Sequence, residues 1–200
     1  MADLDKTELA LGSMPALIVV DMIRGFTSVE CPLGSECDRV KSAIVELLEI
    51  FRQKKWPVYF TTVEYSDSKQ ASVFRAKLPA LEVLQSGSIW TEIDPDMDRQ
   101  KNEPIIVKHW ASAFFKTDLD TRLEANGVDS LVVVGLTTSG CVRATCVDGL
   151  QHNYPVFLPE EGTGDRNTDA HQSNLHDLNM KYIEVISIKS LKEQLLNKEP

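Results

Sequence analysis

The sequence has no long apolar run and no cluster of basic residues. No stretch approaches the roughly 20 consecutive apolar residues that a membrane-spanning helix needs. Asp and Glu (30) outnumber Lys and Arg (21), which gives a formal net charge of −9 at pH 7. Phosphate binding needs clustered cations, so this pattern argues against a nucleic-acid surface. We therefore expect neither a membrane nor a nucleic acid as a partner.

Cysteine and histidine are few and follow no metal-binding spacing. The four cysteines form no C-x-x-C pair, and the four histidines form neither an H-E-x-x-H motif nor a Cys/His ladder. The first 15 residues include three acidic side chains and a single lysine, whereas a secretion signal would begin with a basic segment, so we expect a cytoplasmic protein. Cytoplasmic thiols are normally reduced, so we expect free cysteines and no metal site.

The length and composition predict one globular domain. The chain has 200 residues, of which 42% are hydrophobic and 26% charged. A chain of this size buries roughly 70% of its unfolded surface, which is enough for a single core. We predict one domain over residues 1–200, with an N-terminal extension at 1–13. Residues 64–103 form a long irregular excursion with a short helix near 71–85, and we expect this excursion to serve as a lid.

Apolar runs of strand length alternate with segments of helical periodicity. The runs contain little polar alternation, which is typical of parallel strands covered on both faces. The sequence therefore predicts an α/β fold with three layers, α/β/α, around a six-stranded parallel sheet. The expected strands are 15–21, 57–63, 104–108, 130–135, 155–159 and 182–187, and the expected helices are 35–55, 118–127, 141–151 and 168–181.

Three reactive residue types stand where predicted strands end. Asp21 ends the first run, Lys108 ends the third, and Cys141 follows the fourth after the turn "GLTTSG". Chemistry in an open parallel sheet collects at the carboxyl ends of the strands. Each residue also has an ordinary explanation: an Asp that caps a turn, a solvated Lys and a buried Cys. Together they predict a nucleophilic site, whereas Cys146, five residues further on, is better explained by packing.

The predicted surroundings of Cys141 favour acyl transfer. A helix N-terminus and the Lys108 ammonium would both stabilise a thiolate, so we expect the thiol pKa to lie well below 8.5. Asp21 could accept the thiol proton. Backbone N–H groups of the preceding turn could hold the oxyanion of a tetrahedral intermediate.

Four segments carry a family resemblance: "LIVVDMIRGF", "VKHWASAFFKTDL", "VVVGLTTSGCVRATCVDGLQ" and "PEEGTGDR". The chain resembles the cysteine hydrolases of the isochorismatase-like superfamily, in the branch of N-carbamoylsarcosine amidase and maleamate amidohydrolase. This resemblance implies a catalytic triad of Asp21, Lys108 and Cys141 and a cis peptide between Leu136 and Thr137. It also implies an oxyanion hole formed by the backbone N–H groups of Thr137 and Cys141, no cofactor, and a homodimer or homotetramer.

Departures from neighbouring branches narrow the expected reaction. Nicotinamidases carry an Asp/His metal cluster after the second strand, but here that place reads "TTVEYSDSK" and has no histidine. True isochorismatases, which cleave a vinyl ether, lack the cysteine. The resemblance therefore implies C–N bond hydrolysis of a small amide or ureide, with release of ammonia through a thioester or thiocarbamate. The alternatives are a catalytically silent binding or thiol-sensing protein on the same fold, or a hydrolase of the nicotinamidase or isochorismatase type.

Two residues are candidates for substrate binding. Arg166, in "GDR", is similar in position to an arginine that reads the substrate carboxylate in the carbamoylsarcosine branch, although it could instead pair with its neighbour Asp165. Phe26 resembles the aromatic wall of the family's pocket, although an aromatic residue in a loop often only packs. Arg143 could face either the site or solvent.

Overall fold

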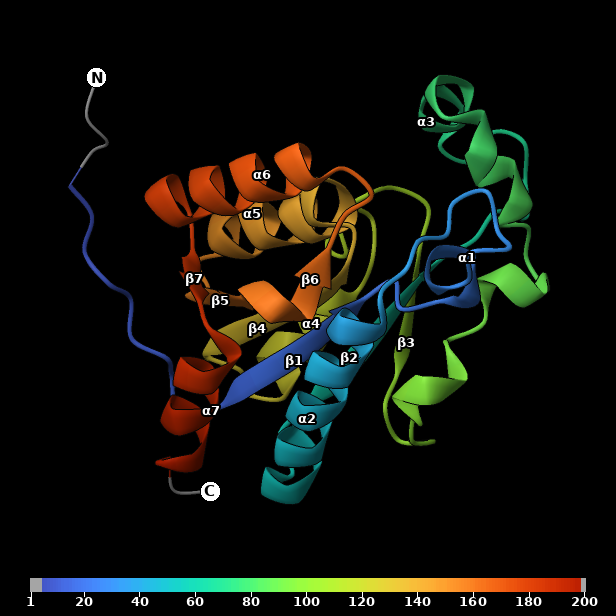
Figure 1. The fold of residues 1–200 in the computed structure, drawn as a ribbon. Helices are drawn as coiled ribbons and strands as arrows, with labels where there is room; N and C mark the ends of the chain where they lie inside the picture. Colours follow the sequence, from blue (N-terminus) through green and yellow to red (C-terminus); the bar gives the residue numbers. More distant parts are fainter. Residues whose placement is uncertain (1–4, 199–200) are drawn as a thin grey trace.

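The computed structural model describes residues 5–198, which fold into a parallel sheet between two layers of helices (Figure 1). The strand order is β3-β2-β1-β4-β5-β7, and the short β6 pairs with β4 beyond the end of β5. Every pairing between the strands of this sheet is parallel. The strands are β1 Pro15–Val20, β2 Val58–Val63, β3 Ile105–Lys108, β4 Ser130–Leu136, β5 Val156–Pro159, β6 Thr163–Gly164 and β7 Glu184–Ile186.

The three-layer prediction is confirmed, with a seventh strand added. All six apolar runs form strands, within two residues of the predicted bounds at each end. The extra strand, β6, has only two residues, and its pairing of Thr163 with Gly135 could not be read from a hydrophobic pattern. The third run differs in one respect: β3 is the edge strand, and Ile105 and Val107 on it are exposed.

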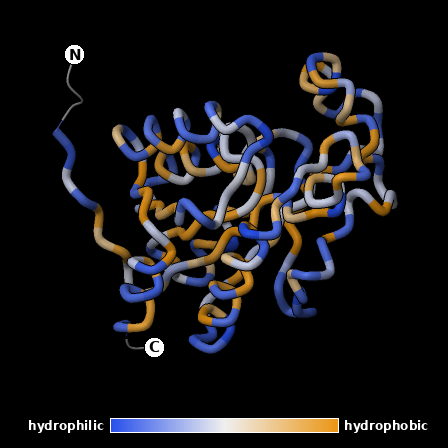
Figure 2. The backbone as a smooth tube through the Cα atoms, in the orientation of Figure 1, coloured by the Kyte–Doolittle hydropathy of each residue, from blue (hydrophilic) through white to orange (hydrophobic). Residues whose placement is uncertain are grey.

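Alternate residues of β1 face opposite layers of helices. Leu17 and Val19 pack toward α2 Asp38–Lys54 and α7 Ile188–Leu196. Ile18 and Val20 pack in the core that also contains buried residues of the helices α4 Leu119–Ala125, α5 Arg143–Gln151 and α6 Thr168–Lys181. In Figure 2 the central strands are the most hydrophobic part of the backbone, while the helices alternate between hydrophobic and hydrophilic residues.

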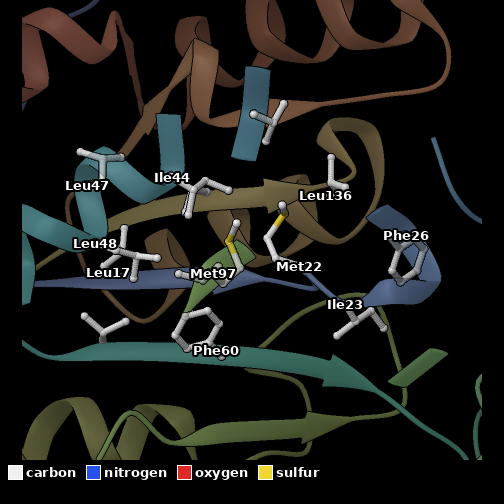
Figure 3. Close-up of a cluster of buried hydrophobic side chains, with 14 of the residues drawn as sticks. Leu17, Met22, Ile23, Phe26, Ile44, Leu47, Leu48, Phe60, Met97 and Leu136 are labelled. Carbon is white, nitrogen blue, oxygen red and sulfur yellow. The ribbon is translucent and has the colours of Figure 1, made fainter. Parts of the chain in front are cut away.

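The core on the α2 side continues to the carboxyl end of the sheet. Figure 3 shows Leu17 and Phe60 from the strands packed near Ile44, Leu47 and Leu48 of α2. Farther along, Met22, Ile23 and Phe26 continue the same cluster past the end of β1. The rim beyond the strands is therefore built on a rigid apolar base, which includes the helix α1 Arg24–Thr27.

The excursion between β2 and β3 contains more local structure than one helix. It holds α3 Ser72–Lys77 and three 3₁₀ turns, at Pro79–Val83, Ile89–Thr91 and Pro95–Met97. The predicted helix near 71–85 stops at Leu78, because a residue before proline is disfavoured in the helical region. Figure 1 shows α3 standing apart from α5 and α6 at the carboxyl end of the sheet.

The N-terminal segment is held near the start of β4, at the end of the strands opposite the carboxyl rim. Residues 5–13 form no helix or strand, and Gly12 and Ser13 donate backbone N–H bonds to the side chains of Ser130 and Asp129. Residues 1–4 of the predicted extension lie outside the described residues. Within residues 5–198, no helix is both long and apolar enough to cross a membrane.

Candidate active site

The three predicted catalytic side chains meet at the carboxyl end of the sheet. Asp21 follows β1, Lys108 ends β3, and Cys141 lies in the turn between β4 and α5. Lys108 Nζ donates a hydrogen bond of 2.8 Å to Asp21 Oδ2, and both side chains are 0% exposed. The Cys141 thiol lies beside this pair, so that both charges affect its pKa, and the residue is 8% exposed. The structure thus brings an acid, an ammonium and a thiol into one buried cluster.

The Asp21 carboxylate is oriented by Thr61, a residue that the sequence analysis did not single out. Thr61, on β2, donates its hydroxyl to Asp21 Oδ1 at 2.5 Å and accepts the Asp21 backbone N–H at 3.0 Å. Asp21 itself adopts a left-handed backbone conformation, with φ of 49°. One carboxylate oxygen is thereby held by Thr61 and the other by Lys108. The available signal was the threonine pair in a fully buried strand, because buried hydroxyls need partners.

The Lys108 ammonium donates hydrogen bonds to two oxygen acceptors. One is Asp21 Oδ2 at 2.8 Å and the other is the backbone carbonyl of Trp110 at 3.0 Å. Burial alone would lower the pKa of this ammonium, but the negative charge of Asp21 outweighs burial and raises the pKa above its ordinary value. Lys108 is therefore a fixed positive charge beside the thiol.

The Cys141 thiol differs from the expectation of a lowered pKa. Burial raises the pKa of Cys141 to about 12, and the charge of Lys108 offsets only part of that rise while Asp21 adds to it. Cys141 also does not open a regular helix: it lies in a π turn, Thr138–Val142, that contains the non-helical Gly140, and α5 begins at Arg143. The resting site therefore holds a neutral thiol next to a carboxylate that can take its proton.

Alkylation of Cys141 by iodoacetamide should reflect this high pKa. Below its pKa, a thiol gains about tenfold in thiolate per pH unit, so the alkylation rate should still be rising steadily between pH 7 and pH 9. Mass spectrometry of the peptide that contains Cys141 measures the rate, and Cys141→Ala supplies the background from the other cysteines. A rate that levels off near pH 7 would contradict the raised pKa.

The turn before the nucleophile is fastened at several points. The peptide bond from Leu136 to Thr137 is cis, at the position the resemblance implied. The Thr137 carbonyl accepts the N–H groups of Gly140 and Val142 at 3.0 and 3.2 Å. Ser139 donates its backbone N–H and its hydroxyl to Asp165 Oδ2 at 2.8 and 2.7 Å. The turn that carries the Thr137 and Cys141 amides is thus a closed hydrogen-bonded unit.

Gly135, near the end of β4, lies too close to β1 to carry a side chain. Its φ is +117°, and a Cβ at this position would lie 2.0 Å from the Val20 carbonyl oxygen on β1. No side chain fits in that space, so glycine is required at this position, one residue before the end of β4. The close approach of β1 and β4 here sets the separation between Asp21 and the nucleophile turn.

A pocket of about 570 Å³ opens above Cys141. Both predicted substrate-binding residues line it, and the Arg166 guanidinium lies 5.9 Å from the centre of the Phe26 ring. Asp165 bonds to Ser139, and no carboxylate in residues 5–198 forms an ion pair with Arg166. Phe74, Leu78 and Leu81 of the excursion also line the pocket, which is where a lid would lie.

The sequence of the chain matches the Isochorismatase domain family over residues 15–190. The chain belongs to the isochorismatase family. It is 33% identical to the maleamate amidohydrolase of Pseudomonas putida, over 94% of this chain and 89% of that protein. It is 31% identical to the N-carbamoylsarcosine amidase of an Arthrobacter species, over 95% of this chain and 74% of that protein.

Solved isochorismatase structures share the fold. An isochorismatase family protein from Desulfovibrio vulgaris superposes with a TM-score of 0.85 at 27% identity, covering 93% of this chain and all of that one. The fold and family expectations from the sequence are therefore confirmed.

Arg143 is a pocket residue whose environment only the structure shows. It lines the same pocket as Cys141, and its Nη2 donates to Asp177 of α6 at 2.5 Å. Asp177 also pairs with Lys181, so one carboxylate serves two cations. The sequence left Arg143 between the site and solvent, and the structure places it at the seam between α5 and α6.

Residues 5–198 contain no group of three or more His, Cys, Asp or Glu side chains placed to hold a metal ion. The four cysteines are all free and buried. The prediction of free thiols is therefore confirmed. Cys146 is 0% exposed in the core under α5, as its interpretation as a packing residue requires.

Proposed function

We propose that this chain is a cofactor-independent amidohydrolase that cleaves the C–N bond of a small amide or ureide. The observation that carries the proposal is the buried cluster of Asp21, Lys108 and Cys141 at the base of a pocket. A neutral thiol beside an oriented carboxylate is arranged for nucleophilic catalysis with a general base. The names of its two relatives, a maleamate amidohydrolase and an N-carbamoylsarcosine amidase, favour the same bond.

The first half of the proposed reaction forms an acyl-enzyme. Cys141 Sγ adds to the substrate carbonyl carbon while its proton passes to Asp21, and Lys108 offsets the negative charge on the cluster. The carbonyl oxygen becomes an oxyanion that the backbone N–H groups of Thr137 and Cys141 stabilise. When the intermediate collapses, the C–N bond breaks and the proton moves from Asp21 to the leaving nitrogen, so ammonia departs from a thioester or thiocarbamate.

The second half releases the acid. Asp21 takes a proton from water, and the resulting hydroxide adds to the same carbonyl carbon. Collapse of this second tetrahedral intermediate breaks the C–S bond, and the sulfur recovers its proton from Asp21. The thiol and carboxylate return to their starting states, so the cycle needs no cofactor.

Ammonia release from a panel of small amides and ureides tests the proposal. The panel pairs each acidic compound, such as maleamate or an N-carbamoyl amino acid, with a neutral compound of the same size, and includes nicotinamide. Turnover of acidic primary amides or ureides, unchanged by a chelator, is the expected result. A protein that binds these compounds without releasing ammonia would instead be the silent binding protein on this fold.

Arg166 should determine selectivity for a carboxylate. A desolvated bidentate pair between arginine and carboxylate is worth about 2 to 4 kcal/mol, so Arg166→Met should lower kcat/KM for an acidic amide by roughly 30- to 1000-fold. A neutral amide of the same size should lose much less. Steady-state kinetics on the matched pair of substrates measures the difference.

The control for Arg166 is Arg39→Met, which removes an exposed arginine from α2 and should leave both substrates unaffected. An equal loss for the acidic and neutral amides would make Arg166 a structural residue.

The homodimer or homotetramer and the cytoplasmic location implied by the sequence remain predictions.

A further inference from the structure

A chain of side-chain hydrogen bonds runs under the nucleophile turn, and the triad does not use it. His171 Nδ1 lies 2.8 Å from Thr138 Oγ1, which lies 3.0 Å from Thr163 Oγ1. Thr163 Oγ1 in turn lies 2.9 Å from the Gly135 carbonyl oxygen. Both threonines are buried, and His171 is half-buried in the first turns of α6. The chain therefore connects α6, the turn, β6 and β4.

The direction of every bond in this chain follows from its last member. A carbonyl oxygen only accepts, so the Thr163 hydroxyl spends its single proton on Gly135. Thr163 must then accept from Thr138, whose own single proton is spent in doing so. Thr138 Oγ1 is left as an acceptor, so His171 must carry a proton on Nδ1. The geometry thus selects the Nδ1–H form of His171.

This hydrogen-bond chain reaches the turn at Thr138, which lies between two other residues of the turn that the site uses. Thr138 follows Thr137, whose N–H we assign to the oxyanion hole, and precedes Ser139, which is bonded to Asp165. Residues of the segment 163–171 therefore form hydrogen bonds with two consecutive residues of the turn, Thr138 and Ser139. Arg166, which lines the same pocket as Cys141, lies in this segment too.

We propose that His171 is a positioning residue whose Nδ1–H holds the Thr137–Cys141 turn in the geometry that binds the oxyanion. This role rests on the proposed amidohydrolase function. The imidazole does not touch the reacting atoms in this role. Its Nδ1–H bond leaves the Thr138 hydroxyl a single orientation, in which it donates to Thr163. Thr138 is thereby held in place, and with it the backbone amide of the preceding residue, Thr137.

Three replacements at one position separate donation from packing. In asparagine the amide nitrogen occupies the place of Nδ1, while in glutamine it occupies the place of Nε2. His171→Leu and His171→Gln should lower kcat roughly 10- to 100-fold with KM changed by less than about threefold, since an oxyanion donor would be misplaced. His171→Asn should stay within about fivefold of wild type. Gln172→Leu, an exposed neighbour on α6, is the control and should retain full activity.

Thr138→Val tests whether His171 acts through the hydroxyl. The double variant Thr138→Val with His171→Leu should be no slower than the slower single variant, because both changes break the same chain. Losses that multiply, or a His171→Asn variant as slow as His171→Leu, would overturn the positioning role. Wild-type kcat in His171→Leu would overturn it as well.

The tautomer can be measured without any substrate. Long-range ¹H–¹⁵N spectra of the ¹⁵N-labelled wild-type protein should show His171 protonated on Nδ1 at neutral pH, with the signal assigned by its loss in His171→Asn. An Nε2–H tautomer would overturn the chain even if His171→Leu fails to fold. Failure of the wild-type protein to release ammonia from any amide would overturn the proposed function, and the spectra would still decide the bond direction on their own.

Discussion

Replacing Cys141 with alanine or serine is expected to abolish ammonia release, a loss of at least roughly 10⁴-fold in kcat. The acyl-enzyme requires the sulfur, and a serine hydroxyl is too weakly acidic for the same carboxylate to activate it. Because Cys141 lies in a turn at the base of a pocket, both variants should keep the fold. A coupled ammonia assay with thermal unfolding of each variant measures the two effects separately.

Cys146→Ala is the matched control, because Cys146 is a buried cysteine five residues away that plays no part in the cluster. It should retain activity, at a small cost in stability. Near-normal ammonia release by Cys141→Ala would show that the nucleophile assignment is wrong. The site would then have to act by activating water directly.

Asp21→Asn is expected to have opposite effects on turnover and on thiol reactivity. The amide cannot accept a proton, so kcat should fall roughly 10³- to 10⁴-fold. The Asp21 carboxylate raises the pKa of Cys141 and Lys108 lowers it. Removing the carboxylate charge should therefore lower the thiol pKa, and alkylation by iodoacetamide at pH 7 should become faster than in the wild type. Ammonia release and alkylation rates on the same preparation measure both.

Slower turnover together with faster alkylation distinguishes a general base from a residue that only supports the fold. A thiol with a pKa near 12 is ionised in only about one molecule in 10⁵ at pH 7, so the wild-type enzyme depends on Asp21 to move the proton. Asp169→Asn, an exposed carboxylate on α6, controls for the change of charge. If Asp21→Asn slowed alkylation along with turnover, the carboxylate would be maintaining the structure of the site, and the base would have to be another group.

The sequence alone predicted the sheet and the location of the reactive groups. Apolar runs without polar alternation are typical of strands that are buried on both faces of a covered parallel sheet, so the runs at 15–21 and 130–135 indicate central strands. Parallel strands bring their carboxyl ends to one rim, and for this reason Asp21, Lys108 and Cys141 could be placed together before any distance was known. The motif around Cys141 then indicated the family.

Local contacts with no periodic pattern were not predictable in the same way. The two-residue strand β6 exists because Thr163 and Gly164 meet the end of β4, and nothing in their own composition requires it. Likewise, the sequence left open whether Asp165 pairs with its neighbour Arg166, and the structure shows that it bonds to Ser139. The partner of a polar side chain depends on which turn folds against it.

The sequence by itself thus determined the fold, the family and the identity of the three central side chains. Only the tertiary structure decided their chemical state. A helix end and a nearby lysine suggest a thiolate, but burial acts on the charged form of Cys141 more strongly than Lys108 does, and the thiol stays protonated. Desolvation depends on every atom packed around the sulfur, including Asp21 as held by Thr61 from another strand, and such a sum exists only once the chain has folded.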